Sequence, residues 1–103
     1  MRVLSKKYVV NFYNKHPTSK SSLEAFLSEL KSNTWEKPND VIGHYPTADL
    51  ITSKRFVFNI KGNTFRLVAD IDFTHKIVFI VWIGTHANYD KINVRTIEHD
   101  KSD

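Results

Sequence analysis

The stretch RFVFNIKGNTFRLVADIDF, residues 55–73, decides the fold of this chain because apolar and polar residues alternate on both sides of Gly62-Asn63. Alternation with a period of two is typical of strands that bury one face. A glycine-asparagine dipeptide between two such runs indicates a tight hairpin turn. The stretch therefore predicts a β-hairpin with strands over residues 55–61 and 65–73.

The turn also fixes the register of the hairpin, because a one-residue slip would move every side chain to the other face. Apolar residues then face apolar residues across the two strands, and opposite charges meet. The expected pairs are Ile60 with Phe65, Phe58 with Leu67, Asn59 with Arg66, and Arg55 with Asp70.

A third strand over residues 77–85 follows a turn at residues 74–76. A three-residue loop would place Ile71 beside Phe79, Leu67 beside Ile83, and Arg66 beside Gly84. One face of this sheet is expected to be covered, and the other is expected to stay open. The open face would carry Asn59, Arg66, Val68 and Trp82.

Two amphipathic helices precede the sheet and are expected to cover it. Apolar residues recur every four positions over residues 5–15, and Pro17 would stop that helix. The spacing of Ser21 and Glu24 matches a capping box, followed by an apolar stripe that ends near Ser32-Asn33. The chain is thus predicted to be an α+β domain with an N-terminal helical hairpin packed on one face of a small antiparallel sheet.

The remaining segments are expected to be short. Residues 35–53 form a connector with one helical turn at 39–43, and residues 2–4 form an edge strand. A last helical turn is expected at residues 88–93. The connector would pack Trp35, Val41, Ile42 and Leu50 against the domain edge. These boundaries predict one domain over residues 1–94 and a polar tail over residues 95–103.

Composition restricts the function classes. The 103 residues include no cysteine, which excludes disulfides, a thiolate nucleophile and cysteine-ligated metals. No metal site is expected from the histidines His16, His44, His75 and His99 either, because they show no ligand spacing. The absence of cysteine fits a reducing compartment, so we expect a cytoplasmic protein. The longest apolar run is too short to cross a membrane, so no membrane partner is expected. A net charge of +4 is compatible with a polyanionic partner.

Two motifs in this order resemble the HigB-type toxins, a branch of the RelE/ParE toxin superfamily. They are Phe58-Asn59-x-x-Gly62-Asn63-x-x-Arg66-Leu67-Val68 and, further along, Gly84-Thr85-His86-Ala87-x-Tyr89-Asp90. The resemblance covers most of the chain and implies a RelE-like, microbial RNase-like fold. It implies a metal-independent ribonuclease without a cofactor, which cuts mRNA on the ribosome and is neutralised by a HigA-type helix-turn-helix antitoxin.

Arg66 and His86 are the first candidates for catalysis. A guanidinium binds phosphate through two donors, and the motif places Arg66 at the superfamily's sheet arginine. The alternative is that Arg66 only pairs with Asp70 or Asp90. Imidazole titrates near neutral pH, which suits His86 for acid or base work, although a loop histidine often only packs or caps.

Further candidates flank these two residues. Tyr89 could stack on a base, orient the substrate or donate a proton, and Asp90 could orient His86 or cap the turn. Lys61 in the hairpin turn could reach phosphate, and Asn59 could contact ribose or orient Arg66. Trp82 could stack on a base or simply pack on Val68.

The superfamily's best-known site has several lysines and arginines on the sheet, whereas this sequence offers one strand arginine, one turn lysine and one histidine. That departure leaves the acid and the base unassigned. Two other functions therefore stay open. One is a ParE-like toxin that inhibits DNA gyrase, and the other is a non-catalytic RNA-binding module.

Overall fold

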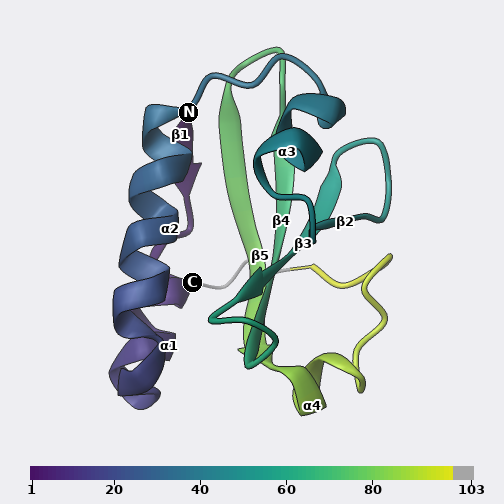
Figure 1. The fold of residues 1–103 in the computed structure, drawn as a ribbon. Helices are drawn as coiled ribbons and strands as arrows, with labels where there is room; N and C mark the ends of the chain where they lie inside the picture. Colours follow the sequence, from purple (N-terminus) through teal and green to yellow (C-terminus); the bar gives the residue numbers. More distant parts are fainter. Residues whose placement is uncertain (99–103) are drawn as a thin grey trace.

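A five-stranded sheet forms the centre of the computed structural model, which describes residues 1–98 (Figure 1). The strand order is β1-β5-β4-β3-β2. The helices α1, α2 and α3 cover one face of it, and α4 lies at the end of β5. The elements are β1 (Arg2–Leu4), α1 (Lys7–Lys15), α2 (Lys20–Ser32), α3 (Pro38–His44), β2 (Asp49–Leu50), β3 (Arg55–Ile60), β4 (Phe65–Asp72), β5 (Ile77–Thr85) and α4 (His86–Tyr89).

The α+β class is confirmed, but the sheet is mixed and not wholly antiparallel. β2 to β5 run antiparallel to their neighbours, whereas the predicted edge strand at residues 2–4 pairs in parallel with β5. A parallel pair needs a long crossover. Here α1 to α3 and β2 to β4 lie between β1 and β5 in the chain, so that condition is met.

The predicted register of the β3–β4 hairpin is confirmed at all four expected pairs. Its turn comprises residues 61–64, where Lys61 and Gly62 have φ values of 52° and 64°. A glycine adopts this left-handed conformation without steric cost. The hairpin therefore sets Arg66 directly opposite Asn59.

The β4–β5 register is confirmed at one end and wrong at the other. Leu67 pairs with Ile83 and Arg66 with Gly84, as expected. The pairing then shifts between Val68 and Ala69, so Ile71 lies beside Val78 and not beside Phe79. A bulge gives one strand an extra residue. The extra residue is Val81, which joins Trp82 in the apolar cluster on the face away from the helices.

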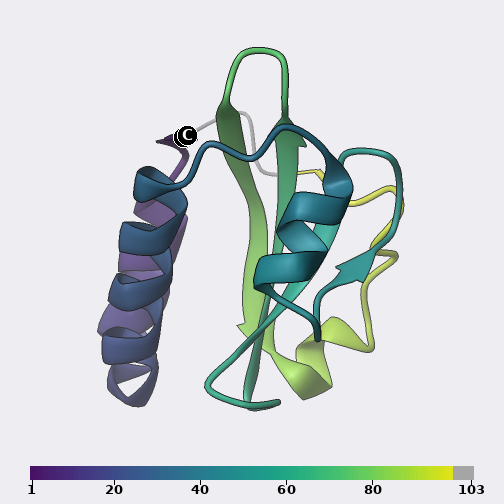
Figure 2. The ribbon, with the colours of Figure 1, turned by 45° about the horizontal axis from the view of Figure 1, so that its top comes forward.

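The helical layer packs on the sheet (Figure 2) and contributes to the main core. Leu23, Phe26 and Leu30 of the predicted α2 stripe are buried. The capping-box prediction is wrong, because a 3-10 turn over Pro17–Ser19 leads into α2 at Lys20 and leaves Ser21 inside the helix. No helix among residues 1–98 is long and apolar enough to cross a bilayer.

The connector contains more structure than expected. The helical turn predicted at residues 39–43 is the longer helix α3, and the edge strand β2 was not predicted. Trp35 and Val41 are buried in the core, and Ile42 packs against it. The prediction for Leu50 is wrong, because its place on an edge strand leaves it 47% exposed.

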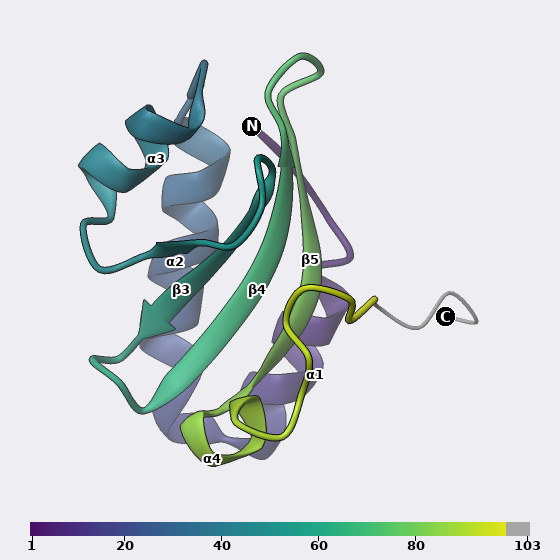
Figure 3. The ribbon, with the colours of Figure 1, turned by 90° about the vertical axis from the view of Figure 1, so that its right-hand side faces the viewer.

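The sheet face opposite the helices is only partly open. Val57, Val68 and Val81 form a second apolar cluster there. The segment after α4 covers it with Val94 and Ile97 (Figure 3). The expectation that Val68 lies on an open face is therefore wrong. The helical turn predicted at residues 88–93 starts earlier, as α4.

The predicted polar tail lies only partly within the described residues. Residues 95–98 belong to the covering segment, whereas residues 99–103, including His99, lie outside the described part. Arg55 donates to the carbonyl oxygens of Arg95 and Ile97. The first residues of the expected tail are thus held against the sheet.

Candidate active site

Arg66 occupies the centre of the candidate site, near the start of β4. It pairs with Asn59 on β3 and with Gly84 on β5, so its side chain lies on the face that the helices do not cover. The side chain is half-buried. Rigid strands on both sides therefore fix the position of this guanidinium.

The Arg66 guanidinium contacts the imidazole of His86, the first residue of α4. Arg66 Nη2 lies 3.2 Å from His86 Nε2. An arginine is always protonated and can only donate, so Nε2 must accept. His86 then carries its proton on Nδ1, which lies 3.5 Å from Asp90 Oδ2. The three side chains form a row in which the lone pair of Nε2 points at Arg66.

Two aromatic rings, those of Tyr89 and Trp82, pack next to the Arg66 guanidinium. The Cζ atom of Arg66 lies 4.7 Å from the centroid of the Tyr89 ring, within the range of a cation–π contact. The Tyr89 ring in turn lies 6.1 Å from the Trp82 ring. Trp82 lies across Gly84, where a side chain would come within 2.5 Å of the indole. The missing side chain at Gly84 thus leaves room for the indole, whose plane is tilted by 57° from that of the Tyr89 ring.

Two buried polar atoms in the site have no protein partner among residues 1–98. They are Arg66 Nε, a donor, and Asn59 Oδ1, an acceptor. The amide nitrogen of Asn59 donates to the Thr47 carbonyl at 3.1 Å, which fixes which way its oxygen points. Unsatisfied buried groups are costly and often occur where a ligand binds.

Within the described residues, no carboxylate lies within ion-pair distance of Arg66. Asp70 is held by Arg55 at 2.7 Å, and Asp90 contacts His86. The alternative that Arg66 only serves a surface ion pair is therefore wrong. Its positive charge is available for an anionic ligand.

The backbone of α4 is fixed by contacts that the sequence analysis missed. The Thr85 hydroxyl accepts a hydrogen bond from the Asn88 amide at 3.2 Å, as a helix N-cap does. The His86 amide donates to the Thr64 carbonyl at 3.3 Å. The first contact could have been predicted, because threonine is a common N-cap residue directly before a helix. The second could not, because every residue has a backbone carbonyl.

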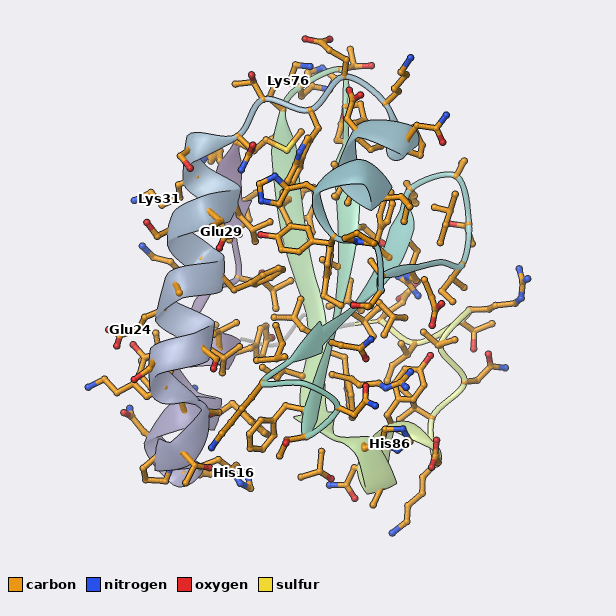
Figure 4. All side chains as sticks on the ribbon, viewed as in Figure 1. His16, Glu24, Glu29, Lys31, Lys76 and His86 are labelled. Carbon is orange, nitrogen blue, oxygen red and sulfur yellow. The ribbon has the colours of Figure 1, made fainter. Side chains whose placement is uncertain are left out.

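The structure brings most of the predicted site residues together. Arg66, His86, Tyr89, Asp90 and Trp82 form one continuous set of contacts, with Asn59 opposite Arg66. Lys61 stays exposed in the hairpin turn outside this set. Figure 4 shows His86 at the end of the sheet far from Lys76. Residues 1–98 contain no group of three or more potential metal ligands.

The chain is an α+β domain with helices packed on one face of an open sheet, as in the RelE-like fold, and its arginine, histidine and tyrosine cluster lies at one end of the other, partly covered face. Comparison with known families agrees, since a family model matches residues 19–92. The chain belongs to the HigB toxin family, described as the RelE-like toxic component of a toxin–antitoxin system.

Curated relatives agree over most of the chain. This chain is 28% identical over 94 residues to "mRNA interferase HigB" of Escherichia coli O6:H1, and the alignment covers 89% of this chain and 91% of the relative. It is also 28% identical over 92 residues to "mRNA interferase toxin HigB" of Escherichia coli strain K12, covering 87% and 88%. The match to "mRNA interferase HigB" of Shigella flexneri has the same extent. Membership of this family implies an antitoxin partner.

Proposed function

We propose that this chain is an endoribonuclease that cuts mRNA as the toxin of a type II toxin–antitoxin system. The family and the names of the curated relatives support the reaction. The observation that carries the assignment to a site is the Arg66 guanidinium, which has no carboxylate partner among residues 1–98 and contacts His86 at 3.2 Å.

RNA can be cut without a metal when its 2′-hydroxyl attacks the adjacent phosphorus in line. The protein must then accept the hydroxyl proton and stabilise the charge of the pentavalent phosphate. Arg66 takes the second role, because a guanidinium binds two phosphate oxygens at once. Its buried Nε, which has no partner, is the donor available for one of them.

His86 takes the first role once substrate is bound. In the free protein its Nε2 lone pair accepts from Arg66. A phosphate that draws the Arg66 donors away releases that lone pair to take the proton of the 2′-hydroxyl. The 2′-oxygen then bonds to phosphorus, the bond to the 5′-oxygen breaks, and the leaving oxygen is protonated by water. The products are a 2′,3′-cyclic phosphate and a 5′-hydroxyl end.

The neighbouring residues position these two. Tyr89 supports the guanidinium from its ring face, and Asp90 keeps the His86 proton on Nδ1. Asn59 Oδ1 is free to accept from a ribose hydroxyl. Trp82 packs beneath Tyr89 in this scheme, and Lys61 contacts the RNA backbone next to the site.

Two partners complete the proposal. The site offers few basic side chains of its own, so we propose that the ribosome positions the mRNA for cleavage. We further propose that the antitoxin is of the HigA helix-turn-helix type. An acidic segment of such a partner would be attracted to the face that carries Arg66 and Lys61.

The test is induction of Arg66→Ala and His86→Gln variants in bacterial cells, with mRNA ends mapped by primer extension. Loss of either group should lower cleavage on the order of 10²-fold or more and relieve growth arrest. Arg2→Ala and His75→Gln are matched controls, because Arg2 is an exposed strand arginine and His75 also pairs with an aspartate, Asp72, at 2.9 Å. These controls should cut as the wild type does.

Three outcomes would contradict the proposal. Unchanged cleavage in both site variants would remove the assigned site while leaving the activity. Growth arrest with intact mRNA and inhibited DNA gyrase would remove the activity itself. Growth arrest with intact mRNA and active gyrase would favour a non-catalytic RNA-binding module. Cleavage by the purified toxin in excess chelator would support the metal-independent mechanism.

A further inference from the structure

Arg55 is the most completely bonded side chain on the sheet face that carries the site, yet it lies outside the catalytic cluster. It is 8% exposed and sits at the start of β3, opposite Asp70. Its Nε and Nη2 donate to the two carboxylate oxygens of Asp70 at 2.7 and 2.9 Å. Asp70 also raises the pKa of the Arg55 guanidinium above its ordinary value, chiefly through these hydrogen bonds.

The third nitrogen of Arg55 binds the backbone of the covering segment. Nη1 donates to the carbonyl oxygens of Val94, Arg95 and Ile97 at 3.1, 3.3 and 2.6 Å. Three backbone carbonyls that accept hydrogen bonds from one guanidinium hold this segment in place, although it forms no helix or strand. Arg55 therefore fastens the segment after α4 to the sheet.

The fastened segment reaches the site through its apolar side chains. Val94 and Ile97 pack in the same cluster as Trp82 and Tyr89. The segment is continuous with α4, whose last residue is Tyr89. Figure 3 shows it crossing the sheet from α4 toward the far end of β5. Tyr89 and Trp82, whose ring centroids lie 6.1 Å apart, thus pack against the same buried valines as the segment that Arg55 holds.

We infer that Arg55 is a positioning residue for the reaction, since by holding the backbone at residues 94–97 it keeps Tyr89 beneath Arg66. The expected effect of Arg55 on the cleavage rate rests on the proposed function. The expected effect of Arg55 on the placement of α4 does not depend on that function. Small displacements of catalytic groups are costly, because a misplacement of about 1 Å can slow a reaction on the order of 10²-fold.

The experiment compares Arg55→Gln with Ile97→Ala, which loosens the same segment without exposing a buried charge. Cleavage of ribosome-bound mRNA is followed in single turnovers, and RNA affinity is measured separately. Both variants should cut on the order of tenfold to 10²-fold more slowly, with affinity nearly unchanged. The matched control is Val9→Ala, which destabilises the core on the helix side and should cut at the wild-type rate when folded.

A double-mutant cycle separates positioning from a loss of overall stability. Arg55→Gln should slow cleavage little further in a Tyr89→Leu background, because the support that Arg55 maintains is already gone. Its effect on the free energy of unfolding should persist in that background. An equal slowing in both backgrounds, or a wild-type rate in both Arg55→Gln and Ile97→Ala, would overturn the inference.

Amide hydrogen exchange tests the placement without any activity. The amides of Asn88 and Asp90 are bonded within α4, to Thr85 and His86. They should exchange faster in Arg55→Gln and Ile97→Ala, whereas amides of β4 should not. Unchanged exchange at Asn88 and Asp90 would overturn the inference even if the wild type failed to cut mRNA. Failure of the proposed function is thus distinguishable, since it would leave the exchange result standing.

Discussion

Replacing Gly84 with alanine should damage both the stability and the activity of this toxin. A Cβ atom at Gly84 would lie 2.5 Å from Trp82 Cη2 and 2.6 Å from Cζ2. Carbon atoms pack at about 3.5–4.0 Å, so the indole must move by about 1 Å or more. It cannot do so freely, because it packs in the cluster with Val68 and Tyr89.

The expected cost is that of overpacking a filled core, about 1–3 kcal/mol. For a domain of this size each kcal/mol corresponds to a decrease of about 4–8 °C in Tm. A moved indole would also displace the Tyr89 ring that supports Arg66. Cleavage should therefore slow even at temperatures at which the variant is fully folded.

Gly43 offers a matched control. Nothing lies within 4 Å of a Cβ atom placed there, and the residue sits inside α3. Alanine is preferred to glycine in a helix by about 0.8–1.0 kcal/mol, so Gly43→Ala should be neutral or stabilising. Gly62→Ala should be destabilised for another reason, because Gly62 has a φ of +64°.

The assay is urea unfolding followed by tryptophan fluorescence, with mRNA cleavage measured on the same preparations. A Trp82→Leu background provides a further check, because a smaller side chain leaves room for the Cβ atom. The penalty of Gly84→Ala should shrink there. Equal stability of Gly84→Ala and the wild type, or a penalty that stays unchanged without the indole, would refute the packing argument.

The remaining predictions concern α3 and α4. The Tyr45 hydroxyl donates to the Glu29 carboxylate, and partial burial together with this bond raises the pKa of Tyr45 above its ordinary value. The stabilisation is complete below the ordinary tyrosine pKa of about 10 and is lost as the pH rises above it. Urea unfolding should thus show a stability difference between wild type and Tyr45→Phe that shrinks above about pH 10; a constant difference would contradict this. Thr85→Ala removes the cap of α4 and should cost about 0.5–2 kcal/mol by urea unfolding. It should slow cleavage as well, and unchanged stability and rate would show that the cap is dispensable.

The sequence was most informative where alternation and turn chemistry agree. Apolar and polar residues alternate around Gly62-Asn63 except at Val57 and Val68, so one register satisfies both strands, and that register puts Asn59 opposite Arg66. The apolar run over residues 77–83 has no such alternation. Nothing in it marks Val81 as the extra residue, and the bulge was therefore missed.

The helix start shows how two local signals can compete. The spacing of Ser21 and Glu24 matches a capping box, yet Pro17 begins a 3-10 turn that already directs the chain into α2. A proline sets its own φ angle and suits the first turn of a helix. The earlier signal prevails, and Ser21 lies exposed in the first turn of α2.

The candidate site was predictable as a set of residues but not as a set of contacts. The hairpin register placed Arg66 and Asn59 together, and the chain beyond β5 brought His86 to the same end. The cover over Val68 was not predictable in this way. Arg55 holds the segment after α4 through the backbone carbonyls of Val94 and Ile97. Because every residue has a backbone carbonyl, no pattern of side chains predicts this contact.

The pairing of β1 with β5 has a consequence for how the toxin is made. Arg2 lies beside Ile77, so the sheet edge closes only after almost all of the strands have been synthesised. Contacts between distant parts of a chain form later than local ones. During translation α1 and α2 can form early, but a nascent chain lacks β5 and α4. Arg66 emerges before His86, so the pair proposed for catalysis can assemble only after almost the whole chain has been synthesised.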